Sequence, residues 1–239
     1  MSRPSRWGDR AVIPAAIEGP GTSLDGGFAE KVKAPARLVA PLPDGVPFDQ
    51  AAAATDAGMT SYHAMMVQGR LKPGMKVGVI GLGGLGSLGA QTAIANGAEL
   101  YVAEVNEKVH AMALEIGATA VAKDIRDFAD KELDLVVDFA GFGTTTAGAV
   151  DIVRRGGRVV QVGLGRSEGT INLQQLTLNE VELVGSQAGT LQDCADVLQL
   201  MADGKLSAHI SQISFDEIGE GIGKLARGEV IGRLVALID

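Results

Sequence analysis

The sequence predicts an α/β protein built around a doubly wound parallel sheet of the Rossmann type. From Lys76 onward, short runs rich in Val, Ile and Leu alternate with longer helical stretches, and a glycine-rich turn separates the first run from the first helix. Near-continuous apolar strands separated by helices are typical of a parallel sheet covered on both faces. We therefore expect this unit to extend from about Gly58 to Gln187.

The individual elements follow from the apolar runs and from the glycines that end the helices. Strands are expected at Lys76–Ile80, Glu99–Glu104, Ala118–Ala122, Leu133–Asp138, Arg158–Val162 and Val181–Gly185. Helices are expected at Leu85–Asn96, Glu107–Ile116 and Thr144–Arg154, which end before Gly97, Gly117 and the pair Gly156-Gly157.

Both ends of the chain depart from this rhythm. Residues 1–49 are rich in Pro and Gly, with short β-like pieces at 11–13, 28–32 and 37–40. After Gln187 the pattern predicts a helix at 191–202, a strand at 210–213, a helix at 215–226 and a strand at 233–238. Because the first 49 residues are too few for a core of their own, we expect them to pack with the C-terminal flank as a second, smaller unit. The predicted division is 1–57, 58–187 and 188–239.

The composition and charge of the chain argue against several classes of binding partner. The 239 residues carry a net charge of −8 with no basic stripe, which argues against nucleic acid or an anionic membrane surface. No apolar run reaches the length of a membrane span, and no secretory signal is recognisable at the N-terminus. The single cysteine, Cys194, excludes an internal disulfide or a multi-cysteine zinc site and is expected to be an inert, half-buried thiol. These features favour a cytoplasmic location.

The glycine-rich turn has the spacing of a dinucleotide-binding motif. It comprises Gly81, Leu82, Gly83, Gly84, Leu85 and Gly86, between an expected strand and an expected helix. In such a turn the first glycine allows the tight bend, the second lets a pyrophosphate approach the backbone, and the third lets the helix pack closely. The N–H groups at the helix start then face the phosphates. The alternative is an ordinary strand-to-helix turn in a glycine-rich chain.

Two acidic residues end expected strands at the carboxyl edge of the sheet. Glu104 lies 23 residues after Gly81, near the spacing of the acid that binds the adenosine ribose. A carboxylate there repels a 2′-phosphate, so NAD is favoured over NADP; the alternative is a solvated charge. Asp138 ends a later strand and is either a ligand-binding residue or an N-cap for the segment that follows it.

Five motifs follow one another in a fixed order. They are Asp25–Glu30, Pro41–Val46, Ala53–Ala64, Leu71–Gly74 and the turn Gly81–Gly86. Together they resemble the zinc-type medium-chain alcohol dehydrogenases. The resemblance implies a GroES-like, β-rich catalytic domain beside the Rossmann domain, and hydride transfer between an alcohol and nicotinamide, with zinc acting as a Lewis acid. It also implies a homo-oligomer, a dimer or tetramer, with Val181–Gly185 as the candidate contact.

The resemblance assigns roles to single positions. Asp56 matches the third zinc ligand, and Thr60 matches a residue near the nicotinamide. Arg233 matches the arginine that pairs with the pyrophosphate. The positions that match the loops around the carboxamide are Val162, Gly163, Leu164, Gly165, Ser186 and Gln187. His63 is expected to pack against a neighbouring helix rather than to bind metal.

One part of the family pattern has no counterpart. The family's first two zinc ligands, a Cys and a Gly-His-Glu motif, precede a Gly-Asp-Arg motif that here is Gly8-Asp9-Arg10, and Pro14–Leu24 replaces the four-cysteine lobe. The chain therefore resembles a dehydrogenase without the first part of its catalytic domain. Two alternatives stay open: a zinc-free quinone or enoyl reductase, and a non-catalytic NAD-binding protein. The substrate class under the main hypothesis is a small alcohol or carbonyl compound.

Overall fold

The computed structural model describes residue 21 and residues 24–238, and its centre is a six-stranded parallel sheet. The strands are β1 (Lys76–Ile80), β2 (Glu99–Ala103), β3 (Ala120–Ala122), β4 (Leu133–Asp138), β5 (Val153–Gln161) and β6 (Glu182–Gly185). Their order across the sheet is β3-β2-β1-β4-β5-β6, the order of a dinucleotide-binding fold. The predicted fold class is therefore confirmed for the sheet, and the order reverses between β1 and β4.

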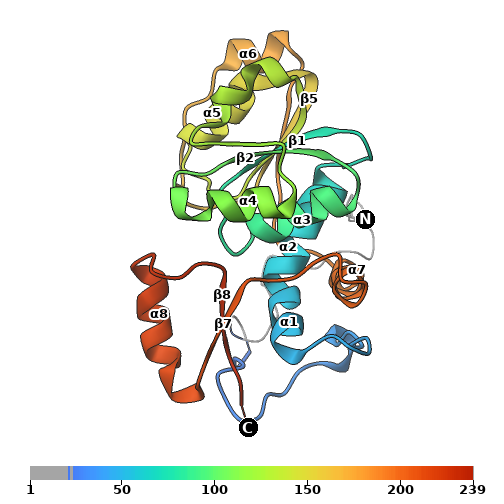
Figure 1. Cartoon of the computed structure of the whole chain (residues 1–239), viewed down its shortest axis with the longest axis vertical. Coiled ribbons are helices and arrows are strands. Elements are labelled where there is room, and N and C mark those ends of the chain that lie inside the picture. The colour runs from blue at the N-terminus through green and yellow to red at the C-terminus, as the bar shows by residue number, and fades with distance from the viewer. Residues whose placement is uncertain (1–20, 22–23, 239) are drawn as a thin grey trace, which may run out of the picture.

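Helices cover both faces of this sheet (Figure 1). One face carries α3 (Gly86–Ala95) and α4 (His110–Ile116), the latter preceded by the short turn η5 (Glu107–Val109). The other face carries η6 (Ile125–Lys131), α5 (Thr144–Ile152) and α6 (Leu173–Leu178). No helix among the described residues is long and apolar enough to cross a membrane.

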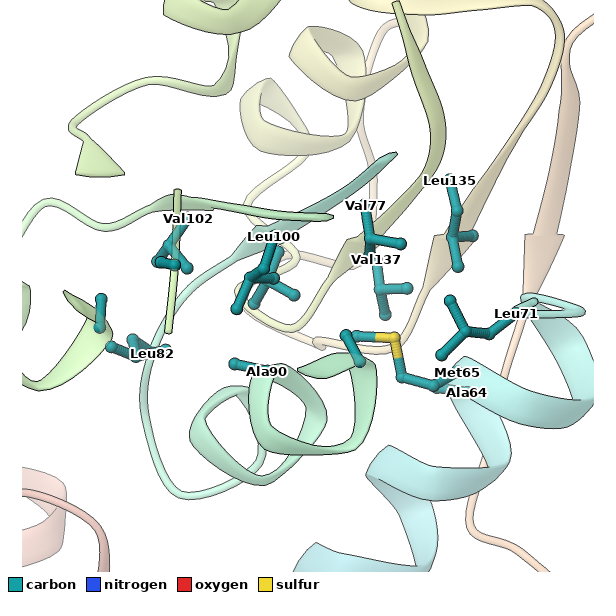
Figure 2. Close-up of a cluster of buried hydrophobic side chains, with 14 of the residues drawn as sticks. Ala64, Met65, Leu71, Val77, Leu82, Ala90, Leu100, Val102, Leu135 and Val137 are labelled. Carbon is teal, nitrogen blue, oxygen red and sulfur yellow. The ribbon is translucent and has the colours of Figure 1, made fainter. Parts of the chain in front are cut away.

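The core follows from the alternation of side chains along each strand. In β1, Val77 and Val79 face the cluster under α3, whereas Ile80 faces the cluster under α5. Leu135 and Val137 of β4 join the first of these clusters beside Val77, and Met65 fills the space beneath them (Figure 2). Strands β1, β2 and β4 are buried on both faces over most of their length, so their apolar runs are nearly continuous.

A single helical stretch, 48–68, connects the two parts of the molecule (Figure 1). It consists of α1 (Phe48–Ala53), η3 (Ala54–Gly58), α2 (Met59–Tyr62) and η4 (His63–Gln68), of which η3 and η4 have π-type hydrogen bonding. Helix α7 (Leu191–Ala202) packs against it so closely that a Cβ at Gly58 would lie 2.7 Å from Val197 Cγ1. The stretch ends under the sheet, where Ala64 and Met65 are fully buried.

The C-terminal flank forms a small unit beside α1. Strands β7 (Ile210–Ile213) and β8 (Arg233–Ala236) pair in parallel, and η7 (Phe215–Glu217) with α8 (Ile218–Ala226) connects them. The Gln50 side chain donates to the Ala208 carbonyl (3.0 Å) and accepts from the Ala208 N–H (2.7 Å). The end of the N-terminal segment is thereby tied to the flank, whereas the domain limits at 57 and 187 stay predictions.

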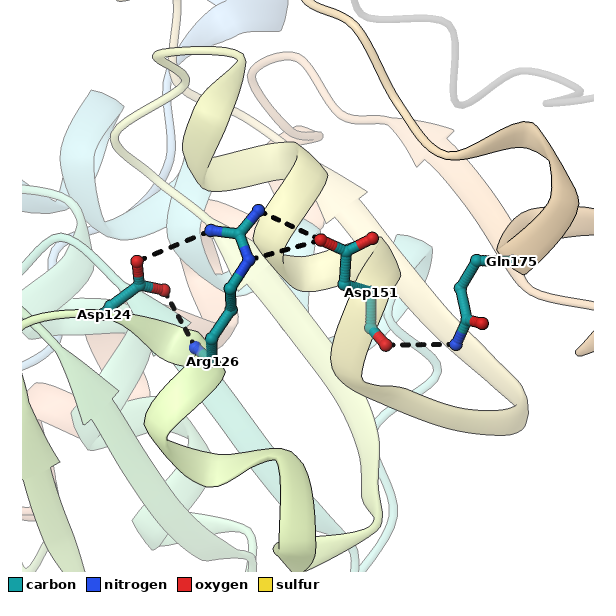
Figure 3. A network of polar contacts seen from close by, with 4 residues as sticks. All are labelled: Asp124, Arg126, Asp151 and Gln175. Atoms are coloured by element: carbon teal, nitrogen blue, oxygen red, sulfur yellow. Dashed lines mark hydrogen bonds and ion pairs between the residues drawn. The ribbon is translucent and has the colours of Figure 1, made fainter.

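An ion-pair network holds the outer layer of the second face together (Figure 3). Arg126 of η6 donates through Nε and Nη2 to Asp151 of α5 (3.2 and 3.0 Å), and its Nη1 lies 3.4 Å from Asp124 Oδ2. The amide of Gln175 in α6 donates to the Asp151 carbonyl (3.0 Å). Three elements separated in sequence are therefore joined through one aspartate.

Several local predictions are wrong. The pieces 28–32 and 37–40 are not strands; instead, η2 (Ala36–Leu38) is a 3₁₀ turn that follows Pro35, and the piece 11–13 lies outside the described residues. The helix from Thr144 ends at Ile152 rather than Arg154, because Val153 is extended and pairs with β4. The expected glycine stop at 156–157 thus lies inside β5, and α6 was not expected at all.

Candidate functional site

The glycine-rich turn lies where β1 ends and α3 begins, next to the point at which the strand order reverses. Gly81 has φ +84°, and a Cβ on Gly86 would collide with the Gly81 carbonyl oxygen. By contrast, a Cβ on Gly83 would meet no described atom within 4 Å. Two glycines are therefore required by the fold itself, whereas Gly83 keeps the backbone open on its outer side.

The start of α3 is suited to an anion. The residue before it, Leu85, offers no side-chain cap. The N–H groups of Ser87 and Gly89 donate to the carbonyls of Gly83 and Leu85 (3.0 and 2.9 Å), so the donors left for a ligand are those of the turn just before them. These donors and the helix dipole together favour negative charge at this end.

Glu104 is tied directly to this turn. Its Oε2 accepts the Leu82 N–H (2.6 Å) and its Oε1 accepts the Asn106 N–H (2.8 Å). Each carboxylate oxygen has two lone pairs, so acceptor capacity remains for hydroxyl donors. A cavity of about 70 Å³ lies between Gly83 and Glu104 on one side and Val230–Gly232 of the flank on the other. The carboxylate therefore faces the space beside the turn.

Asp56, Thr60 and Arg233 come together beside the turn. Thr60 donates through its hydroxyl to Asp56 Oδ1 (3.1 Å), and Arg233 Nη2 lies 3.8 Å from Asp56 Oδ2. Arg233 packs along the turn, since a Cβ on Gly84 would lie 2.6 Å from its Cδ. Within the described part of the chain, no group of three or more His, Cys, Asp or Glu side chains is arranged to hold a metal ion. These residues therefore do not provide the ligand set that zinc requires.

Asp138 holds a loop rather than facing a ligand. Its Oδ1 accepts the N–H groups of Ala140 (3.0 Å) and Gly141 (2.8 Å), and its Oδ2 contacts the hydroxyls of Thr145 (2.7 Å) and Thr146 (2.8 Å). The side chain is fully buried, and these contacts use its four acceptor positions. Of the two roles left open by the sequence, the structure shows the capping role: Asp138 caps the segment that follows β4, whereas Gly143 precedes α5.

The loops after β4, β5 and β6 meet at the same edge of the sheet. The N–H groups of Val162 and Gly163 both donate to the Asp138 carbonyl (3.0 Å each), and the Ser186 N–H donates to the Gln161 carbonyl (2.9 Å). The Ser186 hydroxyl is buried and has no hydrogen-bond partner among the described residues.

Gln161 is the residue that sequence reasoning missed at this edge. Its amide donates to the Gly163 carbonyl (2.6 Å), and its Oε1 contacts the Thr146 hydroxyl (2.6 Å). Gln161 is the last residue of a parallel strand, and this position could have predicted that it lies at the ligand-binding edge. Leu164 and Gln187, also predicted at this edge, are both exposed.

His63 lies away from these loops, against α7. Its Nδ1 is 2.9 Å from Asp193 Oδ2, and its Nε2 is 3.2 Å from the Gln68 amide nitrogen. Burial raises the pKa of the Asp193 carboxyl, but hydrogen bonds from His63 and Thr190 outweigh burial and hold that pKa below its usual value. Asp193 also completes the capping box of α7 with Thr190. The contact therefore joins two helices.

Two neighbours of this contact are inert at neutral pH. Burial, followed by the nearby Asp196 carboxylate, raises the pKa of Tyr62 to about 12. Burial and Asp193 likewise raise the pKa of the Cys194 thiol, which keeps it protonated.

Comparison with known proteins identifies the family. The model of the family described as "Zinc-binding dehydrogenase" matches residues 84–203. Two alcohol dehydrogenases of Geobacillus stearothermophilus are 33% and 31% identical, over 92% and 95% of this chain and 67% and 69% of their own length.

Solved structures agree with this assignment. Acetophenone reductase from Geotrichum candidum, in complex with NAD, is 34% identical with a TM-score of 0.76, over 81% of this chain and 57% of that one. The alcohol dehydrogenase of Aeropyrum pernix is 29% identical with a TM-score of 0.84, over 92% of this chain and 68% of that one. This chain thus spans between about half and two thirds of the length of these proteins. The motif series, the sheet order and these similarities agree, and the chain belongs to the zinc-binding dehydrogenase family that includes the alcohol dehydrogenases.

Proposed function

We propose that the chain binds NAD on the turn Gly81–Gly86 and serves reversible hydride transfer between a small alcohol and its carbonyl product. The observation that carries the proposal is the joining of Glu104 to Leu82 beside the open backbone of Gly83. The NAD complex of the acetophenone reductase supports the choice of cofactor. When bound, the nicotinamide ring accepts or donates the hydride.

The adenosine half and the pyrophosphate have a defined set of partners in this proposal. The N–H groups at the start of α3 face the diphosphate, and the Arg233 guanidinium balances its charge. Glu104 accepts from the ribose hydroxyls, and its negative charge disfavours the 2′-phosphate of NADP. Gly83 lets the diphosphate lie against the backbone.

The nicotinamide half is assigned to the edge formed by the loops after β5 and β6. Backbone groups of Val162, Gly163 and Leu164 and the Ser186-Gln187 pair orient the carboxamide in this proposal. The unpaired Ser186 hydroxyl supports the assignment, because a buried polar group without a partner is costly unless a ligand satisfies it. Thr60 lies in α2 and holds Asp56 by a hydrogen bond.

Asp56 is the one position of this chain that the family resemblance assigns to a metal. Its carboxylate is an oxygen donor of a kind that zinc accepts, but its described neighbours are Thr60 and Arg233, and neither is a zinc ligand. The described residues by themselves therefore do not fit a zinc ion. Asp56 stays a proposed metal-site position on the resemblance alone.

We also propose that copies of the chain associate through β6. Within the described part of the chain this strand pairs with β5 alone, and Leu183 on it is 37% exposed. An unpaired strand edge with apolar side chains favours pairing with a second copy. Sedimentation of the wild type and of a Leu183→Lys variant tests this: the proposal expects a dimer or tetramer that the lysine weakens, and a monomeric wild type overturns it.

Calorimetry with NADH and NADPH, followed by an NAD-linked alcohol oxidation assay with metal analysis, tests the main proposal. The expected result is NADH binding at least about tenfold tighter than NADPH, a difference of about 1.4 kcal/mol. Tighter NADPH binding points instead to a quinone or enoyl reductase. NADH binding without turnover of any alcohol points to a non-catalytic NAD-binding protein, and absence of binding to either nucleotide overturns the proposal.

A further inference from the structure

The Arg233 side chain lies between the glycine-rich turn and Asp56. Its stem packs over Gly84, where an added Cβ would lie 2.6 Å from Arg233 Cδ and 3.2 Å from Nη1. Its other terminal nitrogen, Nη2, lies 3.8 Å from Asp56 Oδ2. One guanidinium therefore reaches both the turn and the carboxylate.

The backbone of Arg233 is fixed, so only its side chain can change position. Gly232 has φ +79°, and a Cβ there would collide with the His209 carbonyl oxygen. The Arg233 N–H donates to that same carbonyl (2.9 Å). The side chain itself is 36% exposed, which leaves the guanidinium room to rotate about a fixed origin.

Asp56 is also held at its origin. It lies within the continuous helix 48–68, and the Thr60 hydroxyl one turn later binds its Oδ1 at 3.1 Å. Its second oxygen, Oδ2, is the one directed at Arg233. Two anchored groups, the turn and the carboxylate, therefore compete for one mobile cation.

We infer that Arg233 is shared between Asp56 and the pyrophosphate of the dinucleotide, so that Asp56 opposes dinucleotide binding. The inference rests on the proposed function, because it takes NAD as the ligand of the turn. A diphosphate offers the guanidinium two oxygens and more charge than one carboxylate does, so it displaces the carboxylate when present. By linkage, binding of the dinucleotide releases the Asp56 carboxylate from its cation, and a ligand of Asp56 favours dinucleotide binding.

The expected effect of Asp56 on NADH affinity is small because its side chain is exposed to solvent. Asp56 is 70% exposed, and exposed ion pairs contribute about 0.2–1 kcal/mol. Removing the charge with Asp56→Asn is therefore expected to tighten NADH binding by about 1.4- to fivefold. The gain shrinks as salt rises, because the pair is open to solvent.

A double-mutant cycle tests the inference by calorimetry with NADH on wild type, Asp56→Asn, Arg233→Gln and the double variant. Arg233→Gln is expected to weaken binding by at least about tenfold, because hydrogen bonds between charged groups are lost. In that background Asp56→Asn is expected to have no further effect. The same pattern is expected with ADP-ribose, which has the diphosphate, and no effect with adenosine, which lacks it.

Asp49→Asn is the matched control, since it removes one carboxylate charge from the same helix and is expected to leave affinity unchanged. Arg233→Met, which also removes the charge and keeps an apolar stem, replaces Arg233→Gln if the latter does not fold. If Asp56→Asn leaves NADH affinity unchanged, or tightens it equally without Arg233, the inference is wrong and the proposed function stands. If the wild type binds neither NADH nor ADP-ribose, both are wrong.

Discussion

At the scale of single residues, the glycines of one turn meet different requirements. Gly86 has no room for a side chain because the Gly81 carbonyl lies where its Cβ would be. Gly83 has room, because its Cβ would meet nothing described within 4 Å. The motif predicts different roles for these two glycines, and packing shows that Gly86 is required by the fold whereas Gly83 is not.

This distinction predicts opposite behaviour for two alanine substitutions. Gly86→Ala is expected to lower the free energy of unfolding by more than about 2 kcal/mol, because the turn must open to admit the methyl group. For Gly83→Ala, the free energy of unfolding is expected to stay within about 0.5 kcal/mol of the wild-type value. NADH binding is expected to weaken at least about tenfold, because the methyl group blocks the close approach of the diphosphate. Urea unfolding and calorimetry measure the two effects. A Gly83→Ala protein with wild-type affinity would contradict the assignment of this turn.

Ser186 carries a second prediction at this scale. Its hydroxyl is buried without a described partner, so Ser186→Ala removes an uncompensated desolvation cost. We expect the free energy of unfolding to stay unchanged or to rise by up to about 1 kcal/mol, while NADH binding weakens several-fold. Thermal unfolding with and without NADH separates the two outcomes. A clear loss of stability without ligand would show that the hydroxyl has a partner within the fold.

At the scale of elements, the helix–helix contact between η4 and α7 depends on one buried carboxylate. Asp193 caps α7 through Thr190 and accepts from His63, and its pKa lies below the usual value. Because the pKa of Asp193 is lower in the folded than in the unfolded protein, its ionisation stabilises the fold fully at pH values above the unfolded-state pKa. This stabilisation is lost as the pH falls through the folded-state pKa.

The Asp193→Asn variant tests this contribution. We expect it to be less stable than wild type at pH 7 and to lose the difference as the pH falls below about 3.9, the ordinary aspartate value. Urea unfolding between pH 7 and pH 3 gives the measurement. If the difference in the free energy of unfolding between wild type and Asp193→Asn stays constant over this pH range, ionisation of Asp193 does not contribute to stability.

The network of Arg126 and Asp151 gives a contrasting case among the elements. Their side chains are 42% and 33% exposed, so solvent screens the pair. Arg126→Ala is expected to cost no more than about 1 kcal/mol, with part of that cost due to lost packing of its side chain over Gly148 rather than to charge. A double-mutant cycle with Asp151→Asn separates the two parts, and high salt should remove the coupling. A coupling that survives high salt would show that the pair is shielded from solvent.

At the scale of the whole molecule, the alternation of strands and helices could be predicted from the sequence. Features that depend on contacts between residues far apart in the sequence could not. The six parallel strands follow from apolar runs that need burial on both faces, and the predicted bounds of α7 and β7 agree with the structure. The end of α5 was misjudged because Val153 takes its conformation from β4, a partner that local pattern does not reveal. The glycine turn and Glu104 were predicted from spacing, but Gln161 and the approach of Arg233 to Asp56 depend on which loops the topology brings together.

The helical stretch 48–68 has one further consequence. It carries Asp56 near its middle and buries Met65 beneath the sheet near its C-terminal end, with no non-helical residue between them. This continuous connection couples the position of the carboxylate to that of the strands. We therefore expect any tightening around a bound molecule to come from the opposite wall, where residues 230–232 line a small cavity with Gly83 and Glu104.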